Sequence, residues 1–209
     1  MSLYVRLKTL FDDNPNDVDP GKRFLSYVMD WFVGALFMNL PISLLWLFQT
    51  RDMEAVSHLD LWLVKSELGQ GQAYLFGCIG IVFALIYFVW IPYKVWPGQT
   101  LGKRTMGIEM VNLDGSNLSL GTLCIRQVIG TFLIEGTFYQ ISGILRALIT
   151  ISTGLNFTGI LLYQGLMCSI GSAALCMFYQ SHRMLHDYIA KTKVVRVSSK
   201  DKEKHHGKY

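Results

Sequence analysis

The sequence has few charged residues. Of its 209 residues only 16% are Asp, Glu, Lys or Arg, whereas 51% are hydrophobic, and this balance is unusual for a soluble domain. A helix that crosses a bilayer needs about 20 mostly apolar residues. Windows of that length lie at about residues 24–48, 74–93, 127–151 and 157–179. We therefore expect an all-α polytopic membrane protein with four transmembrane helices.

Signals for export, metal binding and nucleotide binding are also missing. Residues 1–22 hold acids and prolines where a signal peptide has an apolar core, so the first span is expected to be a permanent anchor. His182 and His186 have the spacing of two metal ligands on one helix face, but no further ligand completes a zinc site. In residues 98–104, GQTLGKR, the glycines are one residue too close for a phosphate-binding loop. We expect no metal and no cofactor.

The positions of Lys and Arg predict the orientation in the cell membrane. Four lie in the N-terminal arm up to Arg23, four in the segment 94–126 and eight after the last span, against two in the segment 49–72. Positive residues concentrate on the cytoplasmic side, so both termini are expected in the cytoplasm. The net charge of +4 then has a membrane explanation, and nucleic acid is not expected as a partner.

The chain divides into a cytoplasmic arm (residues 1–22), a transmembrane domain (23–197) and a basic cytoplasmic tail (198–209). Within the domain, residues 108–113 approach the alternation of a strand, and Asp114-Gly115 is a tight-turn pair. We predict a small cytoplasmic β-hairpin here. The β-branched run TKVVRV after the last span could add a strand to it.

Charged residues inside apolar windows are the most informative feature. Arg23 and Asp30 are seven residues apart, nearly two helical turns, so they share one face of the first span. An Asp inside the bilayer costs free energy unless a partner offsets it. The expected topology brings Arg126 and Asp187 to the same leaflet, so we predict that Arg23, Arg126 or both compensate Asp30. Glu135 is a further charged residue, and it is expected to lie deep within the third span.

Three segments together resemble the RDD family of membrane proteins. They are RFLSYVMDWFVG, GQTLGKRTMGIEMVNLDGSNLSLGTLCIRQ and HDYIAKTKVV, and the resemblance covers residues 20–197. It implies that Arg23, Asp30 and Asp187 are the residues that give the family its name. Lys191 replaces a small residue that is common before the Thr of the last motif. The resemblance implies transport of unidentified ligands, with cation/proton antiport in some members.

Three functions are compatible with these residues. In the first, the protein is an accessory or scaffold for a membrane partner, and the cluster of Arg23, Asp30, Arg126, Glu135 and Asp187 fixes the arrangement of the helices. In the second, it is a small secondary transporter that exchanges a monovalent cation for a proton at Asp30, most simply as a homodimer. In the third, Asp30, His186 and Asp187 act as acid–base groups on a membrane-embedded substrate. No nucleophile with an activating base is evident, so we do not expect an enzyme.

Overall fold

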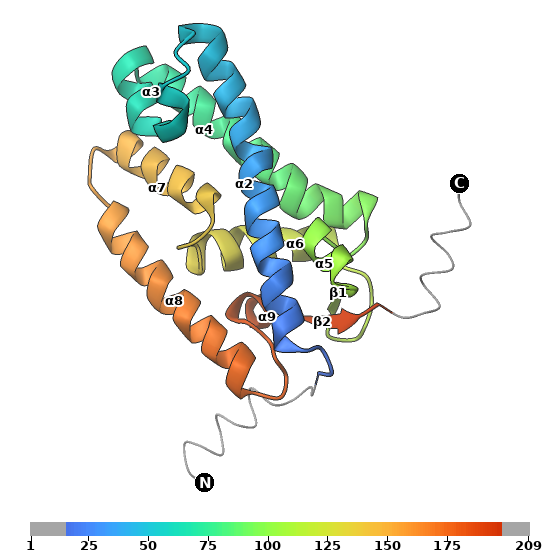
Figure 1. Ribbon diagram of the computed structural model, residues 1–209. Helices are drawn as coiled ribbons and strands as arrows, with labels where there is room; N and C mark the ends of the chain where they lie inside the picture. Colours follow the sequence, from blue (N-terminus) through green and yellow to red (C-terminus); the bar gives the residue numbers. More distant parts are fainter. Residues whose placement is uncertain (1–15, 198–209) are drawn as a thin grey trace, which may run out of the picture.

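The computed structural model describes residues 16–197, and most of them are helical (Figure 1). In chain order the elements are α2 (Pro20–Thr50), η1 (Ala55–His58), α3 (Leu61–Leu68), α4 (Gln70–Leu85), η2 (Ile86–Val95), α5 (Leu101–Thr105), β1 (Ile108–Asn112), α6 (Leu120–Cys124), η3 (Ile125–Ile134), α7 (Gln140–Thr153), α8 (Thr158–Phe178), α9 (Leu185–Ile189) and β2 (Thr192–Arg196). The elements η2 and η3 are π-helices that continue α4 and α6.

The long helix α2 has local start and stop signals. The Asp19 carboxylate accepts a hydrogen bond from the Gly21 amide at 2.7 Å, and Pro20 has a φ angle suited to a first helical position. The helix ends where Arg51 adopts a left-handed conformation, with φ of 59°. Its buried face changes from polar to apolar along the helix: Arg23, Ser26, Asp30, Gly34, Met38, Ile42 and Trp46. The polar part of this face positions the charged cluster.

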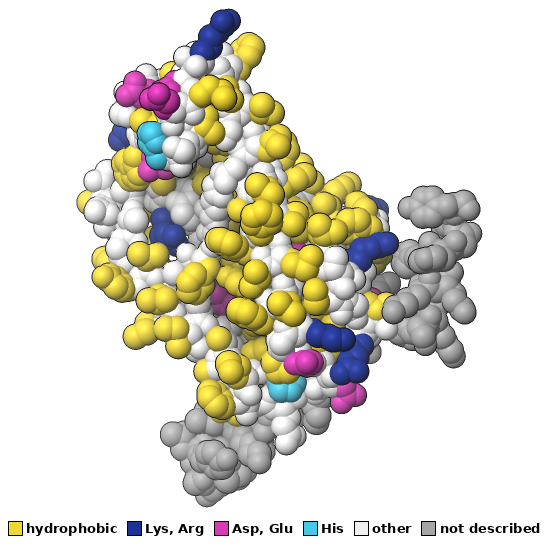
Figure 2. All heavy atoms as spheres, viewed as in Figure 1, with side chains coloured by type: hydrophobic (Ala, Val, Ile, Leu, Met, Phe, Trp, Pro, Cys, Tyr) yellow, Lys and Arg dark blue, Asp and Glu magenta, His cyan; other side chains and the backbone are white. Residues whose placement is uncertain are grey.

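Three helices are long and apolar enough to cross a membrane: Pro20–Thr50, Gln70–Val95 and Thr158–Phe178. Hydrophobic side chains cover the middle of the face in Figure 2, and most charged side chains lie toward its two ends. This distribution is the one that a bilayer requires. The number of four spans predicted from the sequence is not confirmed.

The third span expected at about residues 127–151 is not one helix, and it is interrupted around Glu135, where Gly130 and Gly136 made a local break possible. The helix η3 ends at Ile134, α7 begins at Gln140, and residues 135–139 between them are not helical. The apolar helix Leu120–Ile134 that precedes this break is too short to count among the spanning helices. Hydropathy does not distinguish two half-helices from one long helix, because both are equally apolar.

Side chains from three helices satisfy the backbone carbonyls around the break. Donors come from α2, α7 and α8: Trp31 Nε1 to Phe138 O (2.7 Å), Ser142 Oγ to Phe132 O (2.8 Å), Arg146 Nη1 to Gly136 O (2.8 Å), Gln164 Nε2 to Ile134 O (3.2 Å) and Ser169 Oγ to Glu135 O. An irregular segment at membrane depth is tolerated only when its backbone groups have such partners. The break is therefore stabilised by specific hydrogen bonds from the neighbouring helices.

The predicted β-hairpin is also wrong, although the turn within it forms. The Gly115 amide donates to Asn112 O at 2.9 Å, but no strand follows the turn. Instead β1 pairs with β2 in antiparallel register, with Met110 opposite Val194. The run TKVVRV is thus the only partner of β1 within residues 16–197, and the sheet joins the middle of the chain to the end of the domain.

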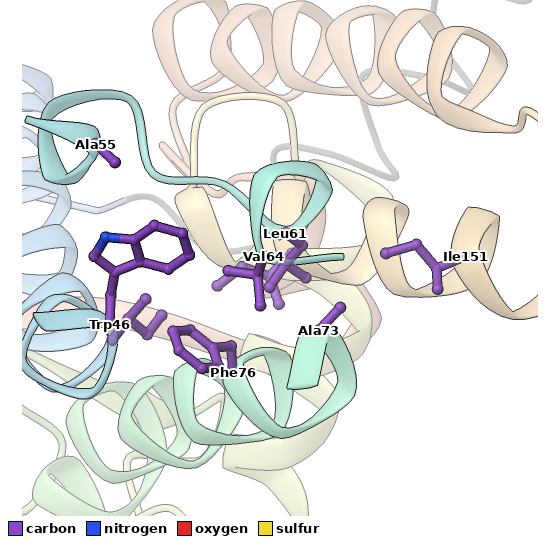
Figure 3. Packing of buried hydrophobic residues seen from close by; sticks show 9 residues of the cluster. Trp46, Ala55, Leu61, Val64, Ala73, Phe76 and Ile151 are labelled. Carbon is purple, nitrogen blue, oxygen red and sulfur yellow. The ribbon is translucent and has the colours of Figure 1, made fainter. Parts of the chain in front are cut away.

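A hydrophobic core closes the opposite end of the molecule, which we call the α3 end. Trp46 of α2 packs with Val64 of α3 and Phe76 of α4, and all three are at most 1% exposed (Figure 3). The other end, which we call the sheet end, contains β1, β2, α5 and α9 (Figure 1). The charged cluster lies toward the sheet end.

Candidate functional site

Asp30 is buried, at 1% exposure, and its two carboxylate oxygens accept four hydrogen bonds. Tyr87 Oη and the Gly102 amide donate to Oδ1, both at 2.9 Å, while Thr100 Oγ1 (2.5 Å) and Lys103 Nζ (3.1 Å) donate to Oδ2. The prediction that Arg23 or Arg126 compensates Asp30 is wrong: Lys103 forms its salt bridge. Burial lowers the pKa of the Lys103 ammonium, and the nearby Asp30 charge opposes that shift.

Glycine at position 102 allows the first turn of α5 to approach Asp30 closely. A β-carbon on Gly102 would lie 2.9 Å from the Asp30 carboxylate carbon and would overlap the Ser26 carbonyl oxygen. Backbone this close to α2 leaves no space for a side chain. The segment GQTLGKR, which superficially resembles a phosphate loop, thus holds a carboxylate of its own chain.

Asp187 is the centre of a second group of charges. Its Oδ2 accepts from Arg23 Nη2 at 2.6 Å, and its Oδ1 accepts from Arg126 Nη2 at 2.8 Å and Nε at 3.1 Å. Burial opposes ionisation of this fully buried carboxylate, but Arg126 and Arg23 outweigh it and hold the Asp187 pKa well below its usual range. These contacts join α9 to α2 and to η3.

Glu135 extends this group through His186. Its Oε1 accepts from Ser172 Oγ (2.8 Å) and from the His186 amide (2.7 Å), and its Oε2 lies 2.8 Å from His186 Nδ1. On the other side of the ring, His186 Nε2 lies 3.0 Å from Arg126 Nη2. Because arginine can only donate, Nε2 must accept, and the proton of a neutral ring is assigned to Nδ1, facing Glu135.

A cavity of about 220 Å³ lies beside both groups, and we call it the inner cavity. Charged or polar liners include Arg23, Ser26, Tyr27, Lys103, Arg126, Gln127, Thr131, Glu135 and His186, and apolar liners include Phe24, Phe88, Phe138 and Ala173. Among the described residues, no three His, Cys, Asp or Glu side chains are placed to hold a metal ion together.

A second cavity, of about 430 Å³, lies toward the α3 end and is called the outer cavity. Its liners include Trp31, Asp60 and Arg146. Phe138 and Tyr139, both in the break between η3 and α7, line both cavities. The broken helix therefore separates two hollows in the membrane domain.

The structure brings four of the five predicted site residues into one connected group: Arg23, Arg126, Glu135 and Asp187. Asp30 has its own group, built from α2, η2, α5 and the residue that precedes α5, Thr100. Sequence reasoning missed Lys103 and its loop, and it did not foresee that His186 connects Glu135 to Arg126. The sequence did contain a signal for Lys103. It is the Lys of GQTLGKR, a segment that was already expected in the same leaflet as Asp30.

Three apolar helices and buried charges joined by internal contacts define an integral membrane protein. The model of the RDD family matches residues 18–191, so the chain belongs to the RDD family. The comparisons with curated proteins and with solved structures found no match.

Proposed function

We propose that this RDD family protein is a scaffold or accessory subunit for a membrane partner, and that its Arg and Asp residues lock the helix arrangement. One observation carries the proposal: Asp30 and Asp187 are at most 1% exposed, and protein donors occupy both oxygens of each. A carboxylate that binds and releases an ion needs an open coordination position. Buried charges that pair within the protein can instead specify one arrangement.

The two aspartates fix the sheet end to the membrane helices. Asp30 holds the first turn of α5, and α5 leads directly into β1. Asp187 holds α9, which leads into β2. The sheet is therefore a platform attached at two points. The distribution of Lys and Arg favours a cytoplasmic position for this platform, where a partner could dock.

Site-specific photo-crosslinking in cells tests this proposal. A photoreactive residue in place of the exposed Asn117, close to the platform, should crosslink to one discrete partner. The same residue in place of Met53, exposed near the α3 end, is the matched control and should not capture that partner. Asn117 crosslinks only to lipid or to a second copy of this chain would contradict the proposal.

A second candidate, cation/proton exchange, is favoured by the two cavities that share Phe138 and Tyr139. In many transporters discontinuous helices form the substrate and ion sites near the bilayer midplane, and Glu135 lines the inner cavity. If this candidate is right, Glu135→Gln abolishes cation-driven proton flux in proteoliposomes, whereas the exposed-site control Glu67→Gln does not. Flux that persists in a folded Glu135→Gln variant would remove Glu135 from any such path.

A further inference from the structure

We propose that the inner cavity binds a phosphate oxyanion, supplied by a phospholipid headgroup or by free phosphate, with Arg23 as its principal contact. The proposal concerns ligand binding and is independent of the scaffold function. It begins from one buried group, Arg23 Nη1, that has no hydrogen-bond partner among the residues the structure describes.

Arg23 uses only part of its guanidinium. The side chain is 4% exposed, and Nη2 donates to Asp187 at 2.6 Å. Nη1 is buried and has no hydrogen-bond partner within residues 16–197. Buried charged donors are nearly always paired in folded proteins, because an unmade hydrogen bond there is unfavourable. An acceptor entering the inner cavity, which Arg23 lines, would provide the missing partner after a small adjustment of the neighbouring side chains.

Further donors converge on the same cavity. Gln127 is 3% exposed, and its side-chain amide makes no hydrogen bond to residues 16–197. The hydroxyls of Tyr27 and Tyr139, which also line the cavity, likewise have no partner in that part of the chain. A tetrahedral oxyanion has several acceptor oxygens and can satisfy donors from several directions at once. A cation would instead be repelled by the Arg23 guanidinium, which has donors and no acceptor.

The charges around the cavity agree with an anion. Arg23, Lys103 and Arg126 line it, against Glu135 as the acidic liner. Both oxygens of Glu135 are already engaged by Ser172 and His186, which moderates its repulsion of an anion. Basic pockets between transmembrane helices on the cytoplasmic side are typical binding sites for phospholipid headgroups.

The cavity wall also suits an acyl chain. Phe24 of α2 and Phe138 of the break line the cavity and are 63% and 55% exposed, and the exposed Ala173 of α8 completes this apolar margin. Arg23 lies in the first turn of α2, a helix long and apolar enough to span a membrane, and the end of such a helix is expected near the headgroup region. A lipid could therefore place its phosphate at Arg23 and its chains over the apolar margin.

Native mass spectrometry of the delipidated full-length protein tests the proposal with three probes. Phosphatidylglycerol carries both phosphate and chains, diacylglycerol carries the same chains alone, and inorganic phosphate carries the oxyanion alone. We expect at least one phosphate-containing probe to bind about tenfold or more tightly than diacylglycerol. Tight binding of phosphatidylglycerol alone assigns the site to lipid, and tight binding of inorganic phosphate assigns it to the free anion.

Variants locate the binding. Gln127→Leu removes one unpartnered donor, and Ala173→Leu narrows the cavity. Neither side chain is hydrogen-bonded to the Asp187 carboxylate. Each should weaken binding about tenfold, whereas Ala174→Leu, the matched control beside Ala173, should not. Arg23→Lys should weaken binding further. If the Arg23→Lys protein does not fold, Gln127→Leu and Ala173→Leu still test the proposal. Equal affinity for phosphatidylglycerol and diacylglycerol with no binding of phosphate, or unchanged affinity in Gln127→Leu and Ala173→Leu, would overturn the proposal.

Discussion

Replacing Asp187 by Asn should destabilise the protein more than almost any other conservative change. The substitution keeps the shape of the side chain but removes its charge, and it leaves the guanidiniums of Arg23 and Arg126 buried without a counter-ion. One of the two oxygens also becomes an NH₂ group that faces an arginine donor. The hydrogen bonds at 2.6 Å and 2.8 Å are then not both retained.

The magnitude follows from the burial of all three side chains, which are at most 4% exposed. Removing one partner of a buried ion pair typically costs about 3–5 kcal/mol, a large part of a total stability of about 5–15 kcal/mol. The assay is the unfolding free energy in mixed micelles, with helix content followed as denaturing detergent is added.

Asp114→Asn is the matched control, because Asp114 is exposed and makes its contacts with Ser116 in a turn. We expect the control to change the unfolding free energy by less than about 0.5 kcal/mol. A loss below about 1 kcal/mol in Asp187→Asn, the size measured for exposed pairs, would refute the claim that this cluster holds the fold together.

Three further predictions concern the charges and the broken helix. A double-mutant cycle on Asp30→Asn and Lys103→Met should give a coupling energy of about 1–3 kcal/mol, measured as unfolding free energies, because the two side chains form a salt bridge at 3.1 Å; additive effects would contradict that pairing. Gly136→Ala should reduce stability strongly, since a β-carbon there would overlap the Phe132 carbonyl, while Gly143→Ala, with no neighbour closer than 3.9 Å, should be neutral or stabilising in the same assay. Stability should also fall in acid: the folded pKa of Asp187 lies well below 3.8, so its contribution is complete above about pH 4 and is lost as the pH falls through the folded pKa. An Asp187→Asn protein should lack that part of the pH dependence, and an identical acid profile would show that other groups cause it.

Helical periodicity and hydropathy were sufficient to predict the three helices that are long enough to span a membrane and to place Arg23, Asp30 and Asp187 toward one end of the domain. Periodicity relates residues on the same helix, however, and cannot rank partners from other elements. Lys103 is 73 residues from Asp30 in sequence, and it reaches Asp30 because Gly102 lets α5 approach α2 closely. That approach is a tertiary contact without a local signature.

The sequence predictions of a β-hairpin and of a third span failed for related reasons. The turn at Asp114-Gly115 is a local feature and forms, but strand pairing is decided by distant residues, and Val194 offers β1 a better-buried partner than the residues after the turn. The break at Glu135 depends on donors such as Trp31 and Ser169, which lie far away in sequence. An apolar window contains no information about such donors.

The most direct test of the scaffold account is cation-driven proton flux in proteoliposomes, with Na⁺, K⁺ and Li⁺ applied in turn to the wild type and to Asp30→Asn. If Asp30 is a structural residue held by Tyr87, Thr100, Gly102 and Lys103, the wild type shows no flux and Asp30→Asn assembles poorly. Flux through the wild type that disappears in a well-folded Asp30→Asn protein would contradict the account and identify a transporter with Asp30 on its path.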